Sequence, residues 1–278
     1  MTSPAPVGSP VKTTPTPVIA LPFFRMRRRP WRLVERNVLA YRRIWYIFLS
    51  GFLEPLLFLL SIGIGVGKLV GDVSVGGHLV PYRSFVAPGL LAIAAMTGSL
   101  LDTTFNFFVK MKYSHTYDAV LASPLSPRDV AIGEITWALI RGATYSGAFL
   151  LTMWAFGDLR SAWSIAALPG AVLIGFGFAG VGLAATTYMR SFVDFDYVNM
   201  AMIPLFLFSA TFFPLSRYPS GLQAVIRFTP LYQGVVLERS LVIGDLHWTL
   251  LVHAGYLVVM GFVGLRIASR RIGLLLQP

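Results

Sequence analysis

Hydrophobic residues in this chain are gathered into six long segments rather than spread in an alternating pattern. The segments cover about residues 44–67, 84–109, 135–156, 163–188, 192–213 and 246–268. A helix needs about 20 apolar residues to cross a bilayer, so each segment is long enough to span one. Every backbone polar group in lipid needs an internal partner, which a helix or a closed barrel provides. A barrel would show ten-residue segments of alternating polar and apolar residues, and the sequence has none. The pattern therefore predicts an all-α integral membrane protein with six transmembrane helices.

The region before the first span has a different pattern. Trp31, Val34, Val38 and Tyr41 recur at helical spacing, and Arg residues and Glu35 lie between them. This pattern predicts an amphipathic interfacial helix over residues 30–43, with its apolar side toward the membrane and Arg toward anionic headgroups. The alternative is that these Arg residues only set the topology.

The chain divides into three parts on this basis. Residues 1–29 form a Pro-rich and basic segment of the kind that usually stays disordered, and we expect a cytoplasmic tail there. Residues 30–43 form the interfacial helix, and residues 44–271 form the six-span domain.

The stretch after the fifth span is too apolar for a free loop and too interrupted for two more spans. It favours short re-entrant or interfacial helices on the extracellular side, between spans five and six. The candidate re-entrant residues are Phe213, Pro214, Phe228, Pro230, Leu231 and Tyr232.

The charge of the chain supports a membrane location and gives an orientation. Hydrophobic residues make up 55% of the chain and charged residues only 13%, with a net charge of +11 and no cysteine. So few charges could not cover a soluble globule of this size, and a disulfide framework is excluded. Nine Lys or Arg residues precede residue 44. With both termini in the cytoplasm, most basic residues lie on the cytoplasmic side, as the positive-inside rule predicts. Membrane topology therefore explains the positive charge, and no nucleic-acid partner is needed to explain it.

The loop between the second and third spans carries two helix signals. A short helix fits residues 116–122 and is stopped by Pro124. Ser126 is a candidate cap for a following helix, with Pro127 at its first position and Asp129 in its first turn. A protruding helix that docks into a partner protein and an ordinary solvated loop fit the pattern equally well.

Four charged residues lie within or at the edge of the spans: Glu54, Asp102, Glu134 and Arg141. An ionisable residue inside a membrane is a functional hypothesis by default. The structural alternatives are that Glu134 marks the cytoplasmic surface and that Asp102 pairs with Arg141. A proton-coupled secondary transporter would use Asp102 or Glu54 as its proton carrier, but the six spans contain no inverted repeat.

The sequence contains no recognisable catalytic, cofactor or metal site. Gly63, Gly65 and Gly67 precede Lys68, but the phosphate-loop pattern fails at Ile62 and Leu69, so the chain has no visible ATPase. Asp194 and Asp196 are the type of pair that binds metal in a glycosyltransferase, which leaves that enzyme as a third alternative. Capping and first-turn roles at the start of the fifth span explain them better, because no other ligand lies in the same loop.

Several segments, in this order and spacing, resemble the membrane subunits of type-2 ABC exporters over about residues 36–271. The similarity is strongest to nodulation lipo-oligosaccharide exporter permeases and daunorubicin-resistance permeases. The segments are Glu-Pro-Leu-Leu-Phe-Leu at 54–59, Gly-Ile-Gly-Val-Gly at 63–67, Phe-Val-Ala-Pro-Gly at 85–89, the loop 117–134, Phe-Phe-Pro-Leu at 212–215 and Phe-Thr-Pro-Leu-Tyr at 228–232. The Pro-rich amino-terminal tail lies outside the family pattern.

The resemblance implies a permease of the bacterial cytoplasmic (inner) membrane that moves an amphipathic, lipid-linked or drug-like substrate outward. It implies two copies of a separate ABC ATPase, which bind ATP and Mg²⁺, and a second permease copy, identical or paralogous. The interfacial helix would also contact the ATPase. The helix that couples the permease to the ATPase would comprise Ser114, His115, Thr116, Tyr117, Asp118, Ala119, Val120, Leu121, Ala122, Ser123 and Pro124.

Overall fold

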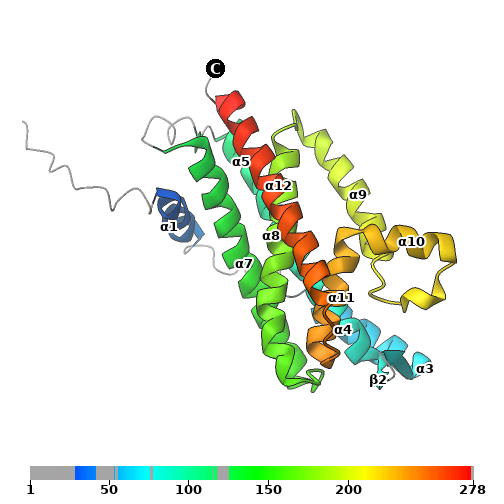
Figure 1. Cartoon of the computed structure of the whole chain (residues 1–278). Coiled ribbons are helices and arrows are strands. Elements are labelled where there is room, and N and C mark those ends of the chain that lie inside the picture. Colours follow the sequence, from blue (N-terminus) through cyan, green and yellow to red (C-terminus); the bar gives the residue numbers. More distant parts are fainter. Residues whose placement is uncertain are drawn as a thin grey trace, which may run out of the picture.

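The computed structural model describes residues 29–41, 53, 56–75, 78–114, 116–117 and 125–276. In this part of the chain the fold is a bundle of long helices with a two-stranded ribbon and shorter helices at one end (Figure 1). The described part begins with α1 (Arg29–Tyr41), which lies beside the bundle, and ends with α12 (Leu250–Leu276), which runs along its length. The mostly helical fold agrees with the prediction from the sequence.

Three helices of the described part are long and apolar enough to cross a membrane. They cover Tyr82–Lys112, Ala162–Thr186 and Leu250–Leu275. The first contains α4 (Tyr82–Leu101), the π-helical turn η4 (Asp102–Asn106) and α5 (Phe107–Lys112). The second contains the 3-10 turn η5 (Ala162–Ala166) and α8 (Ala167–Thr186). These helices coincide with the second, fourth and sixth predicted spans.

The other predicted spans are represented less completely. The third corresponds to α7 (Pro127–Ala155), whose 29 residues are about 43 Å long and include the charged Arg141. The described part of the first contains η3 (Ser61–Val66) and α3 (Gly67–Val70), and Glu54 lies outside the described residues. The six-span arrangement therefore stays a prediction.

The fifth predicted span is shorter than expected. After the turn η6 (Phe192–Asp194), α9 (Phe195–Leu207) has 13 residues and a length of about 20 Å, less than the ~30 Å of a hydrocarbon core. The backbone leaves helical geometry at Phe208, and Ala210 has a positive φ of 56°. The apolar run to residue 213 continues past this turn, so hydrophobicity alone placed the end of the helix too late.

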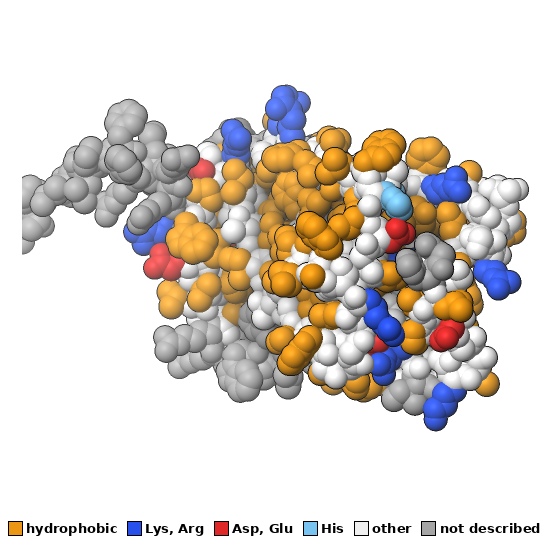
Figure 2. Space-filling view, turned by 60° about the horizontal axis from the view of Figure 1, so that its bottom comes forward, with side chains coloured by type: hydrophobic (Ala, Val, Ile, Leu, Met, Phe, Trp, Pro, Cys, Tyr) orange, Lys and Arg blue, Asp and Glu red, His pale blue; other side chains and the backbone are white. Residues whose placement is uncertain are grey.

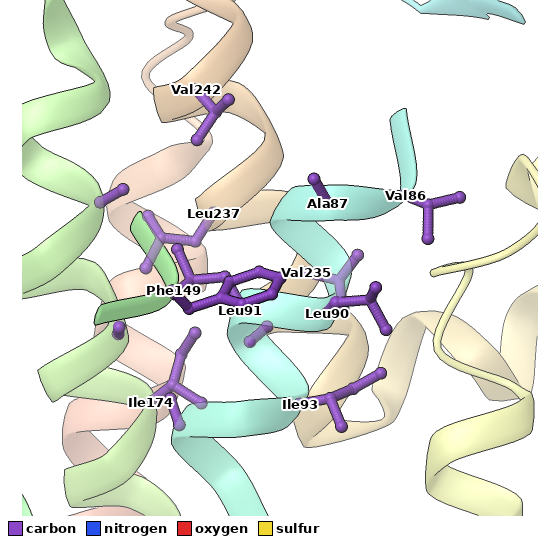
Figure 3. Close-up of a cluster of buried hydrophobic side chains, with 14 of the residues drawn as sticks. Val86, Ala87, Leu90, Leu91, Ile93, Phe149, Ile174, Val235, Leu237 and Val242 are labelled. Carbon is purple, nitrogen blue, oxygen red and sulfur yellow. The ribbon is translucent and has the colours of Figure 1, made fainter. Parts of the chain in front are cut away.

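The core lies around α4. Its neighbours are α7, α8 and α11 (Pro230–Ile243), whose side chains meet those of α4 in one cluster. Figure 3 shows Leu90, Leu91, Phe149, Ile174 and Val235 converging in this cluster. In the apolar window of α4, 83% of the residues are buried, against 17% in α12. We infer that α4 is the central helix and that α12 turns most of its surface to lipid.

The surface agrees with this assignment. Large exposed hydrophobic side chains on α12 include Leu251, Val252, Val259 and Phe262. Figure 2 shows hydrophobic side chains over much of the viewed face of the molecule. A soluble protein rarely exposes so much contiguous apolar surface, whereas lipid covers it without cost.

Close contact between α8 and α12 depends on glycine. A Cβ added at Gly264 would lie 2.3 Å from the carbonyl carbon of Gly180, and one added at Gly180 would lie 2.5 Å from the carbonyl oxygen of Gly261. Both contacts are with backbone, which cannot move aside as a flexible side chain can. Small residues at such crossings let two membrane helices approach closely.

One end of the bundle carries the ribbon and the short helices. Strand β1 (Asp72–Val75) pairs antiparallel with β2 (His78–Pro81), with Val73 opposite Val80. The stretch after α9 contains η7 (Leu215–Arg217), α10 (Ser220–Phe228) and then α11, which packs on α4 and α12. The predicted short helices are present in this stretch, and their re-entry into the membrane stays a prediction.

Candidate functional site

A buried carboxylate holds three segments together at the end of the bundle near α1. We use the name Glu134 cluster for Arg36 and Asn37 of α1, Lys110 of α5, Glu134 of α7, and Tyr117. The bonded pairs that join different segments of the cluster are 24 to 98 residues apart in the sequence, and the tertiary fold brings them together. The cluster lies where the loop that precedes α7 joins the bundle.

Glu134 is the centre of this cluster. Its Oε2 accepts a 2.7 Å hydrogen bond from Lys110 Nζ, and its Oε1 lies 3.4 Å from Arg36 Nη2. Asn37 Nδ2 donates to Oε2 at 3.4 Å, while its Oδ1 accepts from Lys110 at 3.2 Å. The side chain of Glu134 is only 3% exposed, so the two cations compensate a charge that would be costly if buried alone.

Glu134 is covered by α1 rather than open to solvent. The reason is packing between α1 and α7, because a Cβ added at Gly133 would lie 2.9 Å from Leu33 and 3.0 Å from the carbonyl oxygen of Pro30. A glycine at this position lets α1 approach close enough to bury the neighbouring carboxylate. The predicted position of Glu134 at the cytoplasmic surface stays a prediction.

Tyr117 lies inside the protein next to this carboxylate. Its side chain is fully buried, and its ring centroid lies 5.1 Å from that of Phe107. It belongs to a hydrophobic cluster with Leu33, Met111 and Val130. Burial, followed by the negative charge of Glu134, raises the pKa of the Tyr117 hydroxyl well above its usual value. Tyr117 is therefore a neutral anchor at neutral pH.

The other predicted coupling residues are only partly described. Ser114 is exposed and Thr116 is half-buried, and Thr116 and Tyr117 are helical. His115 and residues 118–124 lie outside the described residues. Of the predicted coupling residues that the structure describes, Tyr117 is buried and faces the inside of the protein.

The helix α1 is present as the sequence predicts, and one residue of its predicted membrane-facing side, Val34, packs against the protein instead. Val34 is buried, whereas Trp31 and Val38 are exposed and Tyr41 is half-buried. The buried side consists of Leu33, Val34 and Asn37. The sequence interpretation had placed Trp31, Val34, Val38 and Tyr41 on one apolar face. Leu33 and Asn37 are four residues apart and so lie on the same side of the helix. Because Asn37 is polar, the hydrophobic pattern of the sequence did not indicate that this side is buried.

The remaining interfacial residue, Glu35, points away from α7. Its carboxylate accepts a hydrogen bond from Arg32 at 3.2 Å, and both side chains are more than half exposed. Such a pair contributes little to stability. Glu35 is thus a surface residue, whereas its neighbour Arg36 enters the Glu134 cluster.

A second ion pair lies two helical turns further along α7. Arg141 Nη1 lies 2.6 Å from Asp102 Oδ1, and both side chains are buried. Arg141 Nε also donates to the Tyr145 hydroxyl at 2.8 Å, and the guanidinium lies 5.2 Å from the centroid of the Tyr41 ring. The structure thus contains the Asp102–Arg141 contact that the sequence left as one alternative.

The two clusters repeat the same arrangement at two levels. On α7, Glu134 and Arg141 are seven residues apart and so lie on one side of the helix. Their partners come from α1 in both cases, and from the Tyr82–Lys112 helix in both cases. Asp102 begins the π-helical turn η4, a geometry that is frequent at functional sites. The three helices are therefore cross-linked twice by charged groups.

The acidic pair at the start of α9 has a local role. Asp194 Oδ2 accepts hydrogen bonds from the backbone N–H groups of Arg190 at 2.6 Å and Ser191 at 3.0 Å. Asp196 lies in the first turn of α9. Among the described residues, no group of three His, Cys, Asp or Glu side chains is placed to hold a metal ion.

The predicted re-entrant residues separate into exposed and buried sets. Phe213 and Phe228 are exposed, Pro214 and Pro230 are half-buried, Leu231 is fully buried, and Tyr232 is half-buried. Pro230 is the first residue of α11, a position that needs no backbone N–H donor. Leu231 belongs to the core around α4.

Comparison with known proteins agrees with the resemblance noted in the sequence. Residues 30–242 match the family described as ABC-2 type transporter. The chain is 31% identical to Nodulation protein J of Rhizobium leguminosarum bv. trifolii over 248 residues, which are 87% of this chain and 92% of the relative.

Two further relatives carry the same name. Nodulation protein J of Rhizobium meliloti (strain 1021) is 28% identical over 252 residues, covering 87% of this chain and 92% of the relative. The protein of that name from Azorhizobium caulinodans is 27% identical over 259 residues, covering 89% and 99%. The family match covers well over half of the chain, and its helices suit a membrane. The chain therefore belongs to the ABC-2 type transporter family, as a multi-pass membrane permease.

Proposed function

We propose that this chain is the membrane-spanning permease subunit of an ATP-driven exporter. It moves an amphipathic, lipid-linked or drug-like substrate outward across a bacterial cytoplasmic membrane, with both termini in the cytoplasm. A separate ATPase, in two copies, binds ATP and Mg²⁺, and a second permease copy completes the pathway. The observation that carries the proposal is the double cross-link of α1, α7 and the Tyr82–Lys112 helix.

This cross-link suits the transmission of movement from the cytoplasmic loop to the membrane helices. Tyr117 is anchored against Phe107 of α5, next to the Lys110–Glu134 ion pair at 2.7 Å. A push on the loop would therefore move α5 and α7 together rather than bend the loop alone. Packed elements of this kind shift as rigid bodies between discrete arrangements.

The start of α7 supports the same mechanism. Ser126 and Asp129 form a reciprocal capping box, and Pro127 occupies the first helical position. From this fixed start α7 runs for 29 residues without interruption. Movement of the loop at its first turn is thus transmitted along the whole helix, past Glu134 and Arg141.

The first experiment identifies the energy source. The tagged full-length chain is purified from its native membrane in mild detergent, and co-purifying proteins are identified by mass spectrometry. We expect an ABC ATPase in about equimolar amount. Inside-out membrane vesicles are then tested for uptake of a fluorescent acylated tetrasaccharide, as a lipo-oligosaccharide probe, and of daunorubicin. Uptake that requires an ionophore-sensitive gradient and proceeds without ATP would contradict the proposal.

The second experiment tests the coupling role of the Glu134 cluster. Tyr117→Ala removes the buried ring, and we expect at least a tenfold loss of ATP-driven uptake with the chain still present in the membrane. Tyr117→Phe keeps the ring and should retain most of the uptake. Glu134→Gln should also impair uptake, whereas the matched change Glu35→Gln, on the exposed side of α1, should not. Equal uptake by Tyr117→Ala and Tyr117→Phe would sink the coupling assignment.

A further inference from the structure

An apolar groove lies between α9 and the helices α8 and α12. Its volume is about 630 Å³, within the range of small-molecule sites. The walls include Phe178 and Val181 of α8, Met202 and Leu205 of α9, and Met260 of α12. Figure 1 shows α9 standing beside the α8–α12 pair along its length. No residue of α9 is buried by the described part of the chain, so the space on this side is open for an occupant.

The groove is polar at one end only. Tyr188, Arg190 and Asp194 line this end, close to where α8 stops. The carboxylate of Asp194 is already held by the backbone N–H groups of Arg190 and Ser191. The Arg190 side chain is exposed, so its positive charge remains available at the mouth of the groove.

A second Arg residue extends this positive mouth. The guanidinium carbon of Arg271 on α12 lies 4.3 Å from the centroid of the Tyr188 ring. Arg271 Nε is a buried donor that has no hydrogen-bond acceptor within the described part of the chain. Arg271 does not line the groove itself, but it lies against Tyr188, which does, so a second cation with an unused donor flanks the polar end.

The length of the groove matches one leaflet of a bilayer. Its lining residues on this side run from Asp194, the last residue of η6, to Leu205 of α9, a distance of about 16 Å at 1.5 Å per residue. Half of a ~30 Å hydrocarbon core is about 15 Å. An acyl chain that enters with its headgroup at Arg190 would thus end near Leu205.

We propose that this groove binds one acyl chain of an anionic membrane phospholipid, with its phosphate on Arg190 and Arg271. The site belongs to the cytoplasmic leaflet, a placement that rests on the proposed orientation with both termini in the cytoplasm. The bound lipid fills the space between α9 and the bundle, and so it completes packing that the protein lacks. Anionic lipids are enriched in that leaflet and attract basic residues near the membrane surface.

Lipid binding to the purified full-length chain tests the proposal. After delipidation in detergent, dioleoylphosphatidylglycerol and dioleoylphosphatidylcholine are added separately, and bound lipid is counted by native mass spectrometry. We expect phosphatidylglycerol to bind at least tenfold more tightly. The double variant Arg190→Gln/Arg271→Gln should lower this affinity by about 25-fold, at about fivefold for each Arg near an anionic surface.

Arg266→Gln is the matched control. Arg266 lies on α12 five residues before Arg271, which places it about 140° around the helix, and it is exposed. Arg266→Gln removes one positive charge, half of what the double variant removes, and should change the affinity by less than twofold. Equal binding of the two lipids, or wild-type binding by the double variant, would overturn the assignment.

A photoreactive phosphatidylglycerol provides a measurement on the unmodified chain. With a diazirine near the end of the acyl chain, we expect labels on Met202, Leu205 or Met260. Labels confined to the lipid-facing side of α12, such as Val259, would contradict the proposal. So would displacement of the lipid by the acylated tetrasaccharide, because the groove would then belong to the substrate. The binding assays contain neither ATP nor an ATPase, so their failure leaves the proposed export function intact, and failed export leaves the lipid site intact.

Discussion

Replacing Asp102 with Asn removes the negative charge from a buried ion pair. Asp102 and Arg141 have side chains only 3% and 6% exposed, and their charged atoms lie 2.6 Å apart. Breaking a buried pair by removing one partner typically costs about 3–5 kcal/mol, because the other charge stays buried. Arg141 keeps its 2.8 Å hydrogen bond to Tyr145 and its contact with the Tyr41 ring. We therefore expect a loss at the lower end, about 3 kcal/mol.

This loss should be visible in a melting experiment. A change of about 3 kcal/mol lowers the melting temperature of a chain of this size by about 6–12 °C. The assay is the fraction of detergent-purified chain that stays monodisperse on size-exclusion chromatography after heating. Asp245→Asn, in the exposed loop before α12, is the matched control and should change the stability by less than about 0.5 kcal/mol.

The double variant Asp102→Leu/Arg141→Met separates the pair from its neighbours. Replacing both members of a buried ion pair by apolar residues is often neutral, so the double variant should be more stable than Asp102→Asn alone. A coupling energy of at least about 1 kcal/mol between the two positions is expected from their direct contact. If Asp102→Asn melts within 2 °C of the wild type, the pair does not hold the Tyr82–Lys112 helix and α7 together, and our reasoning is refuted.

Three further predictions concern packing and helix ends. Gly264→Ala should destabilise the chain by about 1–3 kcal/mol, because its Cβ would meet the backbone of Gly180 at 2.3 Å. The control is Gly255→Ala on the same helix, whose Cβ would meet nothing within 4 Å, and the melting temperatures of both variants are compared. Ser126→Ala should cost about 1 kcal/mol by the same assay, because it removes the cap of α7, and Ser126→Thr should restore it. Asp194→Ala should speed hydrogen exchange at the start of α9, because it removes the acceptor of the backbone N–H groups of Arg190 and Ser191.

Local features were predictable because their signals are local. Ser126, Pro127 and Asp129 lie within four residues of one another, and the structure contains the capping box that they predict. Asp194 likewise caps residues next to it in the sequence, as the spacing indicated. The apolar runs also locate helices, since burial in lipid depends on the composition of each segment rather than on its neighbours.

Features that depend on contact between distant segments were not predictable. Glu134 is buried because α1 lies across α7. In the sequence, only Gly133 is a sign of this close contact, and a single glycine does not predict it. Arg36 and Lys110 reach Glu134 from 98 and 24 residues away in the sequence, and no local pattern indicates these contacts. The early end of α9 at Leu207 follows from a backbone turn within an apolar run, where hydrophobicity changes little.

The sequence by itself determined the membrane class, the positions of the main helices and the permease family, because hydrophobic segments and recurring motifs are properties of the chain alone. Only the tertiary structure decided which charges are paired, that Tyr117 faces inward, and that α9 leaves a groove with one Arg residue at its mouth and a second beside it. The physical reason is that the cost of a buried charge, and the space beside a helix, depend on what other segments place there. These contacts join residues tens of positions apart, and no local pattern records them.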